Sequence, residues 1–184
     1  MPDKFKNKYR IQSTRLPYWD YGWNASYFVT ICTKNRLHYF GEIKNANIIL
    51  SEIGNIAKEY WISIPEHFPF VILDEFVIMP NHLHGIIIIK KSQKTKFVET
   101  QNFTSLQERN QFGPQSKNLA SIIRGYKSGV KKYTTINKII FAWQPRYFDH
   151  IIRNQTEFQR IRNYIRYNPL KWQQDRNNQG NLWM

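Results

Sequence analysis

The sequence predicts an α+β domain in which helices pack on one antiparallel β-sheet. Segments rich in β-branched and aromatic residues occur at 27–33 and 71–90, and segments with helical periodicity occur near 53–61 and 119–133. The two kinds of segment alternate along a chain of 184 residues. Because a chain of this length can bury one sizeable core, we expect a single domain with peripheral arms.

The first strand is predicted at 27–33, and 37–43 is expected to return beside it as a short hairpin partner. Ser51 is expected to cap a helix that ends before Pro65. The apolar positions of this helix recur every three or four residues. They are Ile53, Ile56, Ala57, Tyr60 and Trp61.

The next two strands are predicted at 71–79 and 82–90, joined by a tight turn at Pro80 and Asn81. The segment 91–118 is rich in Lys, Gln, Asn, Ser and Thr, which predicts a long, mobile polar loop. It lacks the apolar periodicity that a core element needs.

A helix is predicted at 119–133 and a last strand at 147–151. Asn154 is expected to cap a final helix at 155–168, which Pro169 ends. The resulting order is strand, helix, strand, strand, helix, strand, helix. This order is typical of a ferredoxin-like antiparallel sheet with packed helices.

The charge balance indicates a polyanionic partner, because Lys and Arg number 27 against 13 Asp and Glu, for a net charge of +14. Solvated surface lysines alone would not explain the aromatic content of 16%, and nucleic acid is the expected partner. Residues 1–24 form a basic, aromatic N-terminal arm. The candidate DNA-binding cations of the arm are Lys4, Lys6, Lys8, Arg10 and Arg15. Those of the helix at 119–133 are Arg124, Lys127, Lys131 and Lys132.

The single cysteine, Cys32, cannot form an internal disulfide and is expected to be a small buried hydrophobe. No stretch approaches the roughly 18 apolar residues of a membrane span, and the N-terminus has no apolar signal segment. A cytoplasmic protein without a membrane partner is therefore expected. Residues 173–184 are predicted to form a C-terminal tail.

His82 and His84 alternate with Leu83 on a predicted strand, so their side chains project to the same side, roughly 7 Å apart. Two such imidazoles suit one divalent metal ion, although a same-face pair can also be ordinary surface or core residues. With a phosphate substrate, Mg²⁺ or Mn²⁺ is the expected ion.

Tyr164 and Asn168 share one face of the final helix, because they are four residues apart. The tyrosine is a candidate nucleophile and the asparagine a candidate third metal ligand. Alternatively, Tyr164 is an ordinary tyrosine at the edge of the core. Asn168 is then simply a polar residue at the end of the helix before proline. Tyr167 points away from the apolar stripe and is a poorer candidate. His150 is a core histidine, a phosphate contact or a proton shuttle.

Other chemistries lack their motifs, since the sequence has no P-loop, no G-x-S-x-G and no C-x-x-C. Acidic residues are sparse. The adjacent Asp74 and Glu75 are expected on opposite faces of a strand, which argues against a nuclease that holds two metals by carboxylates alone.

Five segments, spread from about residue 10 to 172, together resemble the REP-associated tyrosine transposases, a branch of the single-tyrosine HUH transposases. They are Arg15-Leu-Pro-Tyr-Trp-Asp20, Tyr27-Phe-Val-Thr-Ile-Cys-Thr33, Met79-Pro-Asn-His-Leu-His-Gly85, Phe148-Asp-His-Ile-Ile-Arg153 and Ile161-Arg-Asn-Tyr-Ile-Arg-Tyr-Asn-Pro169. The resemblance implies a palm-like HUH endonuclease domain over 25–172.

This resemblance also implies that His82 and His84 bind the metal and that Tyr164 is the nucleophile. Asn168 stands where many relatives carry Gln as the third ligand. The implied activity is cleavage and joining of single-stranded DNA at hairpins, through a 5′-phosphotyrosine intermediate.

Two other functions are compatible with the sequence. One is a DNA-hairpin-binding protein with little or no catalysis. The other is an RNA-binding ferredoxin-like domain that stacks bases on its sheet, although an RNP-type aromatic motif is not evident. A monomer and a homodimer, in which Tyr164 serves its own or its partner's histidines, are both compatible with the sequence.

Overall fold

The computed structural model describes residues 4–5, 8–9, 16, 18–91, 116–175 and 177–178. The predictions for Lys6, Arg10 and Arg15, for the side chains of Lys4 and Lys8, and for 92–115 lie outside the described residues. Among the helices that are described, none is long and apolar enough to cross a membrane.

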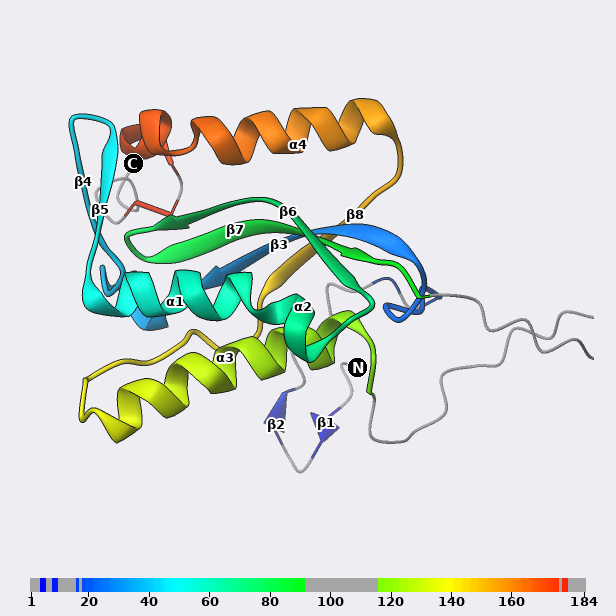
Figure 1. Ribbon diagram of the computed structural model, residues 1–184, viewed down its shortest axis with the longest axis horizontal. Coiled ribbons are helices and arrows are strands. Elements are labelled where there is room, and N and C mark those ends of the chain that lie inside the picture. The colour runs from blue at the N-terminus through cyan, green and yellow to red at the C-terminus, as the bar shows by residue number, and fades with distance from the viewer. Residues whose placement is uncertain are drawn as a thin grey trace, which may run out of the picture.

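Four strands form one antiparallel sheet in the order β6-β7-β3-β8 (Figure 1). They are β3 (Ala25–Cys32), β6 (Val71–Met79), β7 (His82–Ile89) and β8 (Phe148–Ile152). Helix α1 (Glu52–Ile62) lies between β3 and β6 in the chain, and α3 (Leu119–Ile136) lies between β7 and β8. Helix α4 (Gln155–Tyr167) follows β8. The predicted ferredoxin-like α+β fold is confirmed.

Smaller elements flank this domain. They are the paired strands β1 (Lys4–Phe5) and β2 (Lys8–Tyr9), the 3₁₀ turns η1 (Lys34–Arg36) and η2 (Pro169–Gln174), and the short helix α2 (Ile64–His67). The prediction that 37–43 pairs with the first strand is wrong. Strand β4 (Gly41–Lys44) instead pairs with β5 (Asn47–Leu50), because β7 and β8 already occupy both edges of β3. Asn45 and Ala46 have positive φ, as a two-residue hairpin turn requires.

The sheet is covered on both faces, by α1, α2 and α3 on one and by α4 on the other (Figure 1). Alternation along β7 divides its side chains between these layers. Leu83 and Ile87 belong to the larger core, whereas Ile86 packs under α4. His82 and His84 share the face of Ile86. The histidine pair is thus directed into the layer between the sheet and α4.

Gly85 follows the histidine pair because α1 approaches the sheet closely at this point. A Cβ atom at Gly85 would lie 2.4 Å from the ring of Trp61, which is fully buried. The missing side chain lets the Trp61 ring approach β7 closely, and this contact helps to fix the strand that carries the histidines.

Side chains cap the helices as predicted at two positions. Ser51 Oγ accepts a hydrogen bond from the Gly54 N–H, and Asn154 Oδ1 accepts one from the Glu157 N–H. Helix α3 extends three residues beyond its predicted end, and Thr134 in this extension is buried.

The expected alternation fails in β6, where the register with β7 shifts between Leu73 and Phe76. Asp74 and Glu75, predicted on opposite faces, both bind arginines of α4. Arg162 donates two hydrogen bonds to Asp74, at 2.6 and 2.8 Å, and Arg166 donates one to Glu75 at 2.7 Å. The two carboxylates therefore bind α4 to strand β6 of the sheet.

Aromatic residues near the end of the predicted arm pack against the domain. Tyr21 is buried and stacks on Tyr27, while Trp19 Nε1 donates a hydrogen bond to Tyr27 Oη. Burial raises the pKa of Tyr27 to about 12. These rings therefore belong to the core.

Candidate active site

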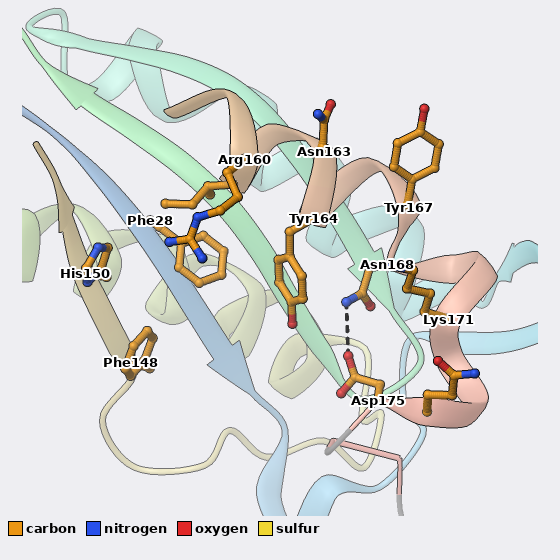
Figure 2. Close-up of a pocket in the computed structure, with 12 residues that line it drawn as sticks. Phe28, Phe148, His150, Arg160, Asn163, Tyr164, Tyr167, Asn168, Lys171 and Asp175 are labelled. Atoms are coloured by element: carbon orange, nitrogen blue, oxygen red, sulfur yellow. Dashed lines mark hydrogen bonds between the residues drawn. The ribbon is translucent and has the colours of Figure 1, made fainter. Parts of the chain in front are cut away.

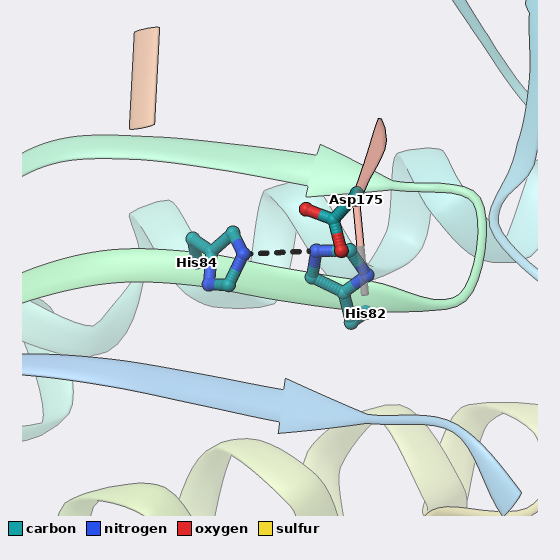
Figure 3. A group of neighbouring side chains, drawn as sticks. All are labelled: His82, His84 and Asp175. Atoms are coloured by element: carbon teal, nitrogen blue, oxygen red, sulfur yellow. Dashed lines mark hydrogen bonds between the residues drawn. The ribbon is translucent and has the colours of Figure 1, made fainter. Parts of the chain in front are cut away.

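His82 and His84 lie at the start of β7, immediately after the predicted turn at Pro80 and Asn81. Both side chains are buried, and their Nε2 atoms are 3.0 Å apart (Figure 3). Two ligand atoms that meet one ion at right angles, each about 2.1 Å away, are about 3.0 Å apart. The spacing of the two nitrogens therefore fits one divalent metal.

The remaining ring nitrogens are held by neighbouring side chains. His82 Nδ1 lies 2.8 Å from Asn81 Oδ1, and His84 Nδ1 lies 2.8 Å from Thr30 Oγ1. Asn81 donates both hydrogens of its amide nitrogen to backbone carbonyls, those of Arg36 and Asn177. Its oxygen can only accept, so His82 carries its proton on Nδ1 and keeps Nε2 as a ligand atom.

A third donor comes from Asp175, in the segment predicted as a C-terminal tail. The ligand atoms of His82, His84 and Asp175 all lie within 4.8 Å of one another, and all three residues are buried. The group could hold a metal ion. The backbone N–H of Asn177 donates to Asp175 Oδ1 at 2.6 Å, and Arg36 binds the Asn177 side chain. Asp175 and Asn177 are thus anchored beside the histidines.

Asn168, the predicted third ligand, lies at the C-terminal end of α4 and is buried. Its Nδ2 donates a hydrogen bond to Asp175 Oδ2 at 3.0 Å (Figure 2). Its Oδ1 is buried without a hydrogen-bond partner among the described residues. An orphaned oxygen at this position is consistent with the predicted ligand role, which stays a prediction.

Tyr164 projects from α4 toward the histidine pair. Its Oη lies 3.2 Å from His84 Nε2, and its ring packs edge-on against Phe28. The residue is 43% exposed, as expected both of a tyrosine at the edge of the core and of a nucleophile, so its role stays a prediction. Tyr167 points away from this position (Figure 2). One chain thus brings the tyrosine to its own histidines.

His150 is half-exposed on β8, which rules out the core reading. Its Nε2 lies 2.8 Å from Glu157 Oε1. A hydrogen bond from the Arg153 N–H, followed by the bond from His150, holds the pKa of the Glu157 carboxyl below its usual range. His150, like Tyr164, lines a groove beside α4.

The predicted cations of α3 lie in the layer across the sheet from α4 (Figure 1). Lys127 Nζ donates to the carbonyls of Gln144 and Arg146, and Lys131 Nζ donates to that of Phe141. Burial lowers the pKa of Lys127. Lys127 and Lys131 therefore hold the segment 141–146 onto α3. Lys127 is partly buried, whereas Arg124, Lys131 and Lys132 are exposed.

The chain is similar to known proteins both in sequence and in structure. No family model matches it. It is 43% identical over 168 residues to a Haemophilus influenzae protein of uncharacterized function, a match that covers 89% of this chain and 91% of the relative. The chain belongs to the same family as that protein.

A second Haemophilus influenzae protein, whose name assigns it to the REP-associated tyrosine transposases, is 23% identical over 157 residues. That match covers 83% of this chain and 74% of the relative. Among solved structures, a REP-associated tyrosine transposase bound to a REP hairpin matches with a TM-score of 0.59 and 19% identity. It covers 88% of this chain and 74% of that one. The fold is therefore transposase-like.

Sequence reasoning missed Asp175, and no pattern marks it. The residue follows Pro169 in a polar segment without periodicity, and its bonds with Asn168 and Asn177 hold it beside the histidines.

Proposed function

We propose that the protein is a metal-dependent endonuclease and strand transferase that acts on single-stranded DNA at hairpins. The observation that carries this proposal is the distance of 3.2 Å between Tyr164 Oη and His84 Nε2. His84 belongs to a buried group with His82 and Asp175 that could hold a metal ion. The transposase-like fold and the hairpin bound by the structural relative support it.

His82, His84 and Asp175 would hold the ion, and Asn168 would orient Asp175 or add its own oxygen. Mg²⁺ or Mn²⁺ suits a phosphate substrate, although the imidazoles accept other metals. When bound, the ion would offset negative charge on the oxygens of the scissile phosphate.

Tyr164 would attack the scissile phosphorus, forming a bond from its Oη to the 5′-phosphate as the bond to the 3′-oxygen breaks. The phenol loses its proton, and the departing 3′-oxygen gains one. A phenol has a pKa of about 10, so loss of its proton near neutral pH would need a bound metal ion or a nearby base. The phosphotyrosine bond conserves the energy of the phosphodiester, and a 3′-hydroxyl can reverse the step and join strands.

The net charge of +14 would favour binding to the negatively charged DNA backbone. Phosphate contacts are proposed for Arg124 and Lys132, and for the arm residues Lys4, Lys6, Lys8, Arg10 and Arg15. Lys127 and Lys131 would contribute mainly by holding segment 141–146. Because Tyr164 approaches the histidines of its own chain, a monomer would suffice for cleavage in this proposal.

The test is to mix the purified protein with labelled DNA hairpins that carry single-stranded flanks, with Mg²⁺, with Mn²⁺ or with a chelator. We expect a covalent adduct that survives denaturation and requires the metal. Tight binding without an adduct would support the hairpin-binding alternative. Preference for a matched RNA hairpin would support the RNA-binding alternative, although α4 already packs on the second face of the sheet.

A further inference from the structure

A groove of about 790 Å³ lies between β8 and α4 and has Tyr164 in its wall (Figure 2). Phe148 and His150 line it from β8, and Arg160 and Asn163 line it from α4. Pockets that bind small molecules are commonly about 300–1,000 Å³ in volume. The groove therefore has room for a nucleotide beside the position of the reacting phosphate.

Phe148 presents an aromatic surface in this groove. It lies on the edge strand of the sheet and is 44% exposed. Its ring packs edge-on against Phe28, with 6.2 Å between centroids, and Phe28 makes a similar contact with Tyr164. The ring of Phe148 is thus supported from one side and open to a ligand, in direct continuity with Tyr164.

His150 supplies a polar edge next to that surface. It lies two residues after Phe148 on β8, so both side chains project to the same face. Its Nε2 is bonded to Glu157, and the other oxygen of Glu157 accepts from the Arg153 N–H. This chain of hydrogen bonds fixes the imidazole and leaves Nδ1 for a ligand.

We propose that the groove binds one unpaired nucleobase that flanks the phosphate attacked by Tyr164. The base stacks on Phe148, and His150 contacts its hydrogen-bonding edge. Arg160 lies 3.7 Å from Glu157 Oε1, but its side chain is 75% exposed and can still contact the adjoining phosphate. The net charge of +14 and the open ring beside the tyrosine favour a nucleotide as the occupant. The inference rests on the proposed function and names the part of the DNA that the site recognises.

The test measures binding in a Tyr164→Phe background, where cleavage is not expected. A DNA hairpin with a single-stranded flank carries 2-aminopurine at one flank position at a time. We expect quenching at a position next to the cleavage site, and loss of this quenching in Phe148→Leu. An abasic site at that position should weaken binding about 5- to 150-fold, as for the loss of one stacked base. In Phe148→Leu the abasic site should have little further effect.

Phe148→Tyr keeps an aromatic ring and should retain both the quenching and the loss of affinity at the abasic site. Tyr133→Leu on α3 is the matched control, and we expect it to change neither the quenching nor that loss of affinity. His150→Ala should alter the preference among the four bases at that position alone. Equal abasic penalties in Phe148→Leu and the parent, or no quenched position, would overturn the inference. If quenching depends on Phe148 but the native protein forms no adduct, the base site stands and the proposed cleavage fails.

Discussion

The phenol oxygen of Tyr164 lies 3.2 Å from Nε2 of His84, although 80 residues separate them in the chain. Two sets of contacts hold this arrangement. Ile161 and Ile165 pack α4 onto Ile86, two residues after His84, and Arg162 binds Asp74 on β6. The tyrosine is thus positioned by the packing of α4, which makes the site a property of the whole fold.

Asp175→Asn should lower the affinity for Mn²⁺ by at least about tenfold, because the buried group loses its negative charge. Titration of Mn²⁺ followed by electron paramagnetic resonance measures the affinity directly. Glu42→Gln removes a carboxylate that pairs with Lys44 at the surface, and is the control. Equal affinity in Asp175→Asn and Glu42→Gln would leave Asp175 as a structural residue.

Thr30→Val should also weaken Mn²⁺ binding, by about 10- to 100-fold, because it removes the hydroxyl beside His84 Nδ1 and keeps the side-chain shape. Thr30→Ser retains the hydroxyl and should bind normally. Calorimetric titration of both variants makes the comparison. A normal affinity in the valine variant would show that the imidazole needs no orienting partner.

Gly85→Ala should destabilise the fold by about 1–3 kcal/mol, because the new Cβ atom would overlap the ring of Trp61. Chemical denaturation measures the free energy of unfolding. Gly125→Ala is the control. Its Cβ would lie 3.3 Å from the Phe68 ring, and the gain in helix propensity of about 1 kcal/mol offsets that tight contact. Unchanged stability in Gly85→Ala would show that α1 can shift at no cost.

Lys127→Ala should lower the free energy of unfolding by about 1–2 kcal/mol, because two carbonyls of segment 141–146 lose their donor. Lys132→Ala should leave stability within about 0.5 kcal/mol. If Lys132 contacts a phosphate, its loss should reduce the log-log slope of DNA affinity against salt by about 0.7–0.9. Denaturation and salt titrations of both variants would separate the structural role of Lys127 from the DNA-binding role of Lys132. Equal stabilities and equal salt slopes in the two variants would contradict these roles.

The sequence was sufficient for those features that depend on local periodicity. Alternation along β7 predicts that His82 and His84 share a face, and the spacing of four on α4 predicts that Tyr164 and Asn168 do. Both placements hold, because an uninterrupted strand and a capped helix keep their periods.

Features that depend on breaks in periodicity could not be predicted. A shift in register turns Asp74 and Glu75 toward the same helix, against the expected alternation. The pairing of β4 with β5 depends on which edges of β3 are already filled. Asp175 reaches the histidines through bonds from Asn168 and Asn177, which only the folded chain brings together.

The central claim is that Tyr164 is the nucleophile of a metal-dependent cleavage of DNA. The most direct measurement is mass spectrometry of the covalent adduct after digestion of the DNA and the protein, which locates the nucleotide on one tyrosine. We predict a nucleotide on Tyr164, no adduct in Tyr164→Phe despite normal folding and hairpin binding, and a normal adduct in Tyr167→Phe. A nucleotide on Tyr167, or an adduct that persists in Tyr164→Phe, would contradict this assignment.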